Sequence, residues 1–161
     1  MFSISYNLNK DTSATVVFTD DNFSFENQSN FFSKDDLKQI NLFKKDIGRA
    51  NFVKFDLIQN NKKKKILLYK LKKTDLEFDY QKAGGVIFKE LETCRDVNIL
   101  TESSLIIKKN NFLFCSNFFL GFFSRSYNFA NYKLKKNDKN ILLKSLSIVT
   151  SSKDKVKKAI N

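Results

Sequence analysis

Few side chains in this 161-residue sequence suit catalysis or metal binding. It contains no His, which excludes histidine metal ligands, histidine-activated nucleophiles and histidine acid–base catalysis. Cys94 and Cys115 are too few and too widely spaced for a zinc site. The acidic pairs at residues 20–21 and 35–36 fit a turn and a first helical turn, where the helix dipole favours carboxylates. We therefore predict no catalytic, cofactor-binding or metal-binding residue in this chain.

Two short motifs could bind phosphate, but each has a structural explanation. Gly84-Gly85 lies inside a helical pattern rather than between a strand and a helix, so it matches neither a dinucleotide-binding loop nor a P-loop. Close approach of another backbone explains the glycines better. Lysines 62–65 could engage a polyanion, and a solvated hairpin tip explains them equally well.

The formal charge of +12 raises the alternative of a small cytoplasmic module that binds nucleic acid. Only Arg49, Arg95 and Arg125 are Arg, so the chain lacks the cluster of planar guanidinium groups that specific recognition uses. A Lys-rich composition is also typical of AT-rich coding sequence. Non-specific binding of phosphate by Lys remains an alternative, and its affinity would fall linearly with the logarithm of salt concentration.

Alternating hydrophobic and helical patterns predict the elements that would hold any site. A strand at residues 2–8 and its neighbour at 14–19 are predicted to form a hairpin. Ser33 opens a capping box for a helix that ends at Gly48. Further strands are predicted at 53–57, 66–71, 97–100 and 141–149. Three further helices are predicted. The first follows a second capping box at 74–77 and ends near residue 95, the second runs from Asn110 or Asn111 through Ser126, and the third covers 153–160.

These elements predict an α/β fold, a mixed and mostly parallel sheet with helices on both faces. The length suits one domain, which we place at residues 1–151. The longest apolar run, 112–123, is interrupted by polar residues and too short to span a membrane. With two Cys and no recognisable leader, we expect a cytoplasmic protein.

The Phe-rich helix is the main candidate for the hydrophobic core. Its aromatic residues recur at mixed helical spacing, which is typical of a helix buried on several sides. A subunit or interdomain contact is the alternative for those that remain exposed. The residues are Phe112, Phe114, Phe118, Phe119, Phe122 and Phe123.

A distinctive motif follows the Phe-rich run: a helix carrying Gly121 runs into an aromatic triplet, Tyr127, Phe129 and Tyr132, and then into a basic segment. This motif resembles the N-terminal domain of the leucyl aminopeptidase (cytosol aminopeptidase) family. Residues 65–71 and 82–85 resemble a strand and a "GG" helix of the same family, in the same order, so that the likeness covers roughly residues 50–161. The positions that carry the main motif are Leu120, Gly121, Arg125, Ser126, Tyr127, Phe129, Tyr132, Lys133, Lys135 and Lys136.

The resemblance implies a macro-domain-like three-layer sandwich without catalytic residues of its own. In that family a C-terminal domain removes N-terminal amino acids from peptides with two zinc or manganese ions, and nothing here matches its signatures. The implied partners are that catalytic domain and further copies in a homohexamer, and residues 152–161 would begin the helix that joins the two domains. The macro-domain likeness also raises a third hypothesis, a nucleotide-like ligand in a crevice at the carboxyl ends of the strands. The sequence lacks a glycine-rich loop for its phosphates.

Overall fold

The computed structural model describes residues 2–5, 12–26, 28–44, 50–59, 62–132 and 143–160. Within these ranges, side chains are described except at Phe2, Ile4, Ser5, Gln59 and residues 127–132. The strands are β1 (Phe2–Ser5), β2 (Ala14–Thr19), β3 (Phe52–Gln59), β4 (Lys62–Lys70), β5 (Asp96–Leu100) and β6 (Ser145–Val149). The helices are α1 (Gln28–Phe31), α2 (Lys34–Lys44), α3 (Glu77–Leu91), α4 (Leu105–Lys109), α5 (Asn111–Tyr132) and α6 (Lys153–Ile160).

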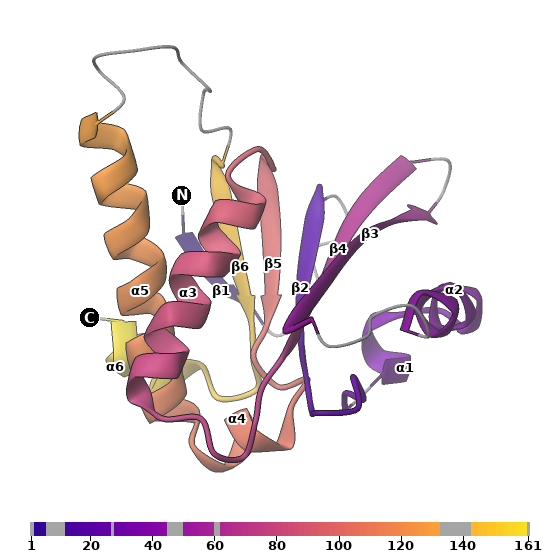
Figure 1. The fold of residues 1–161 in the computed structure, drawn as a ribbon, viewed down its shortest axis with the longest axis horizontal. Helices are drawn as coiled ribbons and strands as arrows, with labels where there is room; N and C mark the ends of the chain where they lie inside the picture. Colours follow the sequence, from indigo (N-terminus) through magenta and orange to yellow (C-terminus); the bar gives the residue numbers. More distant parts are fainter. Residues whose placement is uncertain are drawn as a thin grey trace.

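These strands form one sheet in the order β1-β6-β5-β2-β4-β3, in which β3 is antiparallel to β4 and the other neighbours are parallel. α3, α5 and α6 lie on one side of the sheet, and α1 and α2 lie on the other (Figure 1). The predicted fold class, a mixed and mostly parallel sheet between helices, is confirmed. No helix among the described residues has the length and apolar character to cross a bilayer.

The predicted hairpin between the first two strands is wrong. β1 pairs with β6, while β2 lies between β4 and β5. Every residue of β2 is buried, so this strand needs cover on both faces and both edges, which only the centre of the sheet provides. Residues 6–11, which include the last three positions of the predicted first strand, lie outside the described residues.

The second predicted pair of strands is confirmed, but the lysine block lies in a different place. Lysines 62–65 form the start of β4 and are not a hairpin tip. Lys64 is opposite Leu57 on β3, and only 4 % of its surface is exposed. A lysine can occupy such a position because its long aliphatic stem packs against apolar neighbours.

The helix boundaries follow the local capping chemistry. The Ser33 capping box is confirmed, since the Asp36 amide donates to the Ser33 hydroxyl and the Ser33 amide donates to the Asp36 carboxylate. Gly48, the predicted stop of this helix, lies outside the described residues. The second box was predicted two residues too early: Asp75 accepts from the Lys72 amide and closes a separate turn, and α3 begins only after it.

Two predicted boundaries in the second half of the chain also differ. α5 continues to Tyr132 instead of ending at Ser126, because no Pro or Gly follows Ser126 to break the helix. The Ser126 hydroxyl donates to the Phe123 carbonyl of the same helix. The last strand begins at Ser145, so residues 143–144 of the predicted range are not part of it, while residues 141–142 lie outside the described residues. The predicted helix at 153–160 is confirmed as α6.

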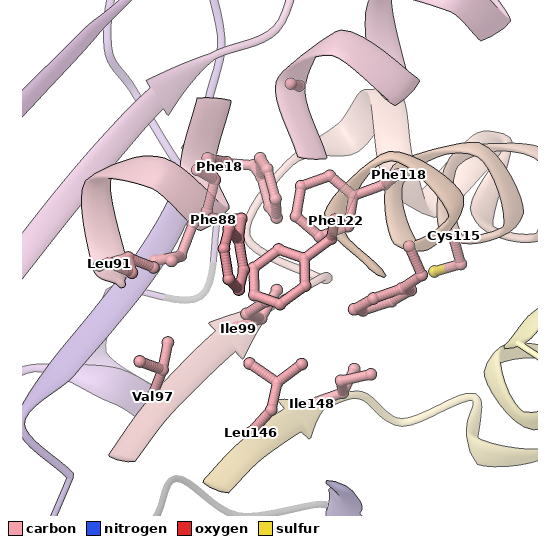
Figure 2. Close-up of a cluster of buried hydrophobic side chains, with 14 of the residues drawn as sticks. Phe18, Phe88, Leu91, Val97, Ile99, Cys115, Phe118, Phe122, Leu146 and Ile148 are labelled. Atoms are coloured by element: carbon pink, nitrogen blue, oxygen red, sulfur yellow. The ribbon is translucent and has the colours of Figure 1, made fainter. Parts of the chain in front are cut away.

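The larger core lies between the sheet and the pair α3 and α5. Figure 2 shows Phe88, Phe118 and Phe122 meeting above strands β5 and β6. Phe118 is fully buried and packs edge-on against Phe18, with the ring centroids 5.4 Å apart. Most of the Phe-rich helix is therefore core, as predicted, but Phe112 and Phe123 are exposed.

Two glycines allow α3 and α5 to cross with their backbones in contact. A Cβ added to Gly84 would overlap the carbonyl oxygen of Phe118, and one added to Gly121 would overlap the carbonyl oxygen of Gln81. Gly85 has no such neighbour, since its added Cβ would lie 3.8 Å from the Gly121 carbonyl oxygen. The prediction that the glycine pair marks a close approach of another backbone is confirmed at Gly84.

Candidate functional site

A cleft of about 330 Å³ lies at the carboxyl ends of β2, β4 and β5. After β2 the chain passes to α1 and α2 on one face of the sheet, and after β5 it passes to α4 and α5 on the other (Figure 1). Such a reversal between neighbouring parallel strands opens a crevice at their ends. The lining residues come from three connections: Asp20, Asp21, Asn22, Ser24, Phe25 and Glu26; Leu71 and Lys73; and Ser103, Ser104, Leu105 and Ile106.

The rim that follows β2 is held by one carboxylate. An Asp20 side-chain oxygen accepts hydrogen bonds from the amides of Asn22, at 2.9 Å, and Ser24, at 2.8 Å. Between them, Phe23 has a φ of 56°, a left-handed conformation that non-glycine residues adopt infrequently. The Lys70 ammonium lies 4.5 Å from the centroid of the Phe23 ring. The predicted turn at residues 20–22 is confirmed, and Asp20 shapes the backbone of this turn.

The floor of the cleft depends on Ser103, which is fully buried. Its hydroxyl accepts from the Phe18 amide on β2 and donates to the Leu100 carbonyl on β5, each at 2.8 Å. Its carbonyl accepts from the Glu26 amide at 2.7 Å. One residue thus ties two strand ends to the loop that forms the opposite wall, so its hydroxyl is used in the fold.

We expect Ser103→Ala to lower the free energy of unfolding by about 1–3 kcal/mol, because it leaves the buried Phe18 amide and Leu100 carbonyl without this partner. Urea unfolding followed by circular dichroism measures the change. Asn22→Ala, on the exposed rim of the same cleft, is the matched control and should stay within about 0.5 kcal/mol of the parent. Equal effects of the two substitutions would contradict the role given to Ser103.

Carboxylates outnumber ammonium groups in the lining of the cleft, with Asp20, Asp21 and Glu26 against Lys73, although the whole chain is strongly basic. The pKa of Tyr69 is raised to about 12 by burial and, secondarily, by the carboxylates of Asp75 and Asp79. Burial also raises the pKa of Asp75, and Asp79 and Asp21 add to the rise, while the hydrogen bond from the Lys72 amide opposes it. With Asp20, Asp21 and Glu26 in its lining, the cleft is poorly suited to phosphate. This weakens the hypothesis of a nucleotide-like ligand.

The Asp75 carboxyl should make stability depend on pH. Its raised pKa means that the folded state binds this proton more tightly than the unfolded state. This favours folding below the unfolded pKa, near 4, and the contribution is lost as the pH rises through the raised pKa. We expect Asp75→Asn, which keeps an acceptor for the Lys72 amide, to gain melting temperature relative to the parent between about pH 4 and pH 7. Parallel melting curves across this range would contradict the expectation.

The other motifs singled out in the sequence do not converge on this cleft. Two of the lysines on β3 and β4 form ion pairs: Lys54 with Glu90 at 2.7 Å and Lys65 with Asp56 at 3.8 Å. Asp36 caps α2, as described above. The aromatic triplet lies on the last two turns of α5, and its side chains are outside the described part of the structure.

The two cysteines are buried and free, and they belong to the larger core. Burial raises the pKa of the Cys115 thiol to about 12 and also raises the pKa of Cys94. Neither environment produces the thiolate that nucleophilic catalysis or metal binding needs. Across the described residues, no three His, Cys, Asp or Glu side chains are grouped so that they could hold a metal ion.

The amino-acid sequence predicts this cleft only in general terms. The sequence predicts that parallel strands leave a crevice at their carboxyl ends, but it does not show that residues 20–26 and 103–106 face each other. Ser103 was missed because a lone Ser after a strand is a common turn residue.

These features define a class of protein by fold, an α/β three-layer sandwich with a six-stranded, mostly parallel sheet. Among solved structures, a tomato leucine aminopeptidase variant shares this fold with a TM-score of 0.58 and 13 % sequence identity. The match covers 98 % of this chain and 35 % of that chain, so the present sequence spans about a third of the length of the tomato enzyme. No family model and no curated protein sequence matches the chain. At this identity the likeness shows the fold.

Proposed function

We propose that this chain is a non-catalytic N-terminal domain of a leucyl-aminopeptidase-like zinc metallopeptidase, with a structural role in assembly. The observation that carries the proposal is the uneven coverage of the structural match: nearly all of this chain corresponds to a minor part of an aminopeptidase. The sequence motif at residues 120–136 supports it independently. Under this proposal residues 1–151 form the domain, and residues 152–161 begin the helix that leads to a catalytic domain.

The geometry of α6 is compatible with such a connecting helix. Val156 is fully buried against the core, while Lys155, Lys157 and Lys158 are exposed. One face of the helix is therefore anchored to this domain. The partner of this domain would be the catalytic domain. That second domain would supply all the ligands of the two zinc or manganese ions.

The assignment is tested by assaying the purified chain for hydrolysis of leucine amide with added Zn²⁺ or Mn²⁺, beside a complete leucine aminopeptidase as positive control. We expect no turnover from the chain and normal turnover from the control. Turnover that co-purifies with the chain and disappears on unfolding would overturn the proposal. Reading the codons downstream of Asn161 gives a second test, for which we expect an open frame longer than this chain that carries the zinc-ligand signatures.

The alternative function, binding of nucleic acid, is favoured by the charge of +12. It predicts a mobility shift of a DNA or RNA duplex or single strand at low salt, with an affinity that falls linearly with the logarithm of salt concentration. Two of the lysines on β3 and β4, Lys54 and Lys65, already form ion pairs with carboxylates. We therefore expect no shift at physiological salt.

A further inference from the structure

An apolar stripe runs along the solvent-facing side of α5. We define the α5 stripe as its four exposed large hydrophobic side chains: Phe112 and Leu120, each 54 % exposed, and Leu113 and Phe123, each 39 % exposed. Pairs of these residues lie three, seven, eight or eleven positions apart, and these spacings place all four on one face of the helix. The opposite face, with Phe114, Phe118 and Phe122, fills the core.

The α5 stripe contains no charge that could recognise a charged partner. Between Asn111 and Ser124 there is no Asp, Glu, Lys or Arg, although such residues make up 29 % of the chain. The small polar side chains Ser116 and Ser124 lie on the same face as the apolar ones. A partner for this surface is therefore recognised by shape and apolar contact rather than by ion pairs.

The pattern of large and small side chains is complementary to itself. Suppose that two copies of α5 pack antiparallel about a twofold axis that passes at the height of residue 118. A residue that lies a given number of positions after 118 in one copy then faces the residue the same number of positions before 118 in the other copy. Leu120 then faces Ser116 of the second copy, and Phe112 faces Ser124. Such alternation of large and small residues lets the side chains of packed helices interdigitate. Leu113 faces Phe123, which adds an apolar contact at each end.

We propose that the α5 stripe is a self-association surface whose partner is a second copy of this chain. The inference rests on the proposed assembly role, to which it adds the surface and the partner. The four side chains expose the equivalent of about two whole side chains per copy, on the order of 350 Å². Two copies together bury less than the roughly 1,200 Å² of a stable specific interface, so we expect the isolated chain to form only a weak dimer.

Salt dependence distinguishes this dimer from binding to an acidic partner. Two chains of charge +12 repel each other, and added salt screens that repulsion without weakening the apolar contact. We expect sedimentation velocity to show about tenfold tighter self-association in 0.5 M than in 0.05 M NaCl. A monomer at about 1 mM protein in both buffers, or association that weakens with salt, would overturn the proposal.

Paired substitutions test the surface and its register. We expect Leu120→Glu to raise the dimer Kd at least about tenfold, and Leu42→Glu to leave it unchanged. Leu42 is the matched control because it is 64 % exposed on α2, on the other side of the sheet from α5 (Figure 1). Both positions are exposed, so we expect each variant to fold, and circular dichroism is the check. A dimer that Leu120→Glu does not weaken overturns the proposal.

The register has its own test, because residue 116 of one copy faces residue 120 of the other. Ser116→Lys and Leu120→Glu should each be monomeric alone, and an equimolar mixture should form a heterodimer with one new Lys–Glu pair. Failure of the mixture to associate would overturn the antiparallel register. If the parent chain is monomeric and does not hydrolyse leucine amide, the self-association surface is wrong and the proposed function stands. If the chain dimerises and hydrolyses leucine amide, the surface stands and the proposed function is wrong.

Discussion

Gly84→Ala is expected to lower the free energy of unfolding by about 3 kcal/mol or more. The added methyl group would overlap the Phe118 carbonyl oxygen and lie 2.7 Å from the Phe122 amide nitrogen. Both atoms belong to the backbone of α5, so no side-chain rotation relieves the overlap. The two helices must separate, and the core between them loses its contacts.

The neighbouring glycine provides the control for this result. Gly85→Ala places its methyl group 3.8 Å from the nearest atom, the Gly121 carbonyl oxygen, which is an ordinary contact. Since Ala favours the helix over Gly, we expect Gly85→Ala to stabilise the protein by up to about 1 kcal/mol. In a chain of this length the Gly84 variant should melt about 10 °C below the parent, and the Gly85 variant slightly above it. Similar melting temperatures for the two variants would contradict the backbone contact.

Phe118→Ala should have the second large effect, a loss of about 3–5 kcal/mol. The Phe118 ring is stacked on Phe114 at 5.3 Å and edge-on to Phe119 at 5.0 Å, and it also meets Phe18 of the central strand. Removing it leaves a cavity at the point where α5 meets the sheet (Figure 2). Chemical unfolding with a fitted midpoint and slope gives the change directly.

Phe112→Ala is the control on the same helix. The Phe112 side chain is 54 % exposed, so its truncation should cost no more than about 1 kcal/mol. The same variant should weaken the self-association proposed for the α5 stripe. A loss of stability at Phe112 as large as that at Phe118 would mean that the exposed face of α5 is covered within the folded chain.

The assembly role and the α5 stripe rest on different observations. The role depends on the match of nearly the whole chain to about a third of a leucine aminopeptidase. The stripe depends on exposure and spacing along one helix. The cleft supplies a third feature, and its carboxylate lining predicts poor binding of phosphate esters at this end of the sheet.

The sequence by itself determined the features that depend on near neighbours in the chain. The capping box at Ser33, the adjacent strands β3 and β4 and the helix α6 all follow from patterns within a few residues. Close packing at Gly84 was also predictable, because glycine in the middle of a helix is unfavourable unless another backbone approaches it.

Only the tertiary structure decided which distant segments meet. The pairing of β1 with β6 joins residues more than 140 positions apart, and hydrophobic alternation along one strand says nothing about its neighbour in the sheet. Likewise, Gly121 faces α3, the Ser103 hydroxyl bridges β2 and β5, and the opposite face of α5 stays exposed. The contact at Gly121 depends on the crossing of α3 and α5, and the Ser103 bridge depends on the pairing of β2 with β5. Neither can be read from local patterns, since burial depends on the surface that a neighbouring element covers.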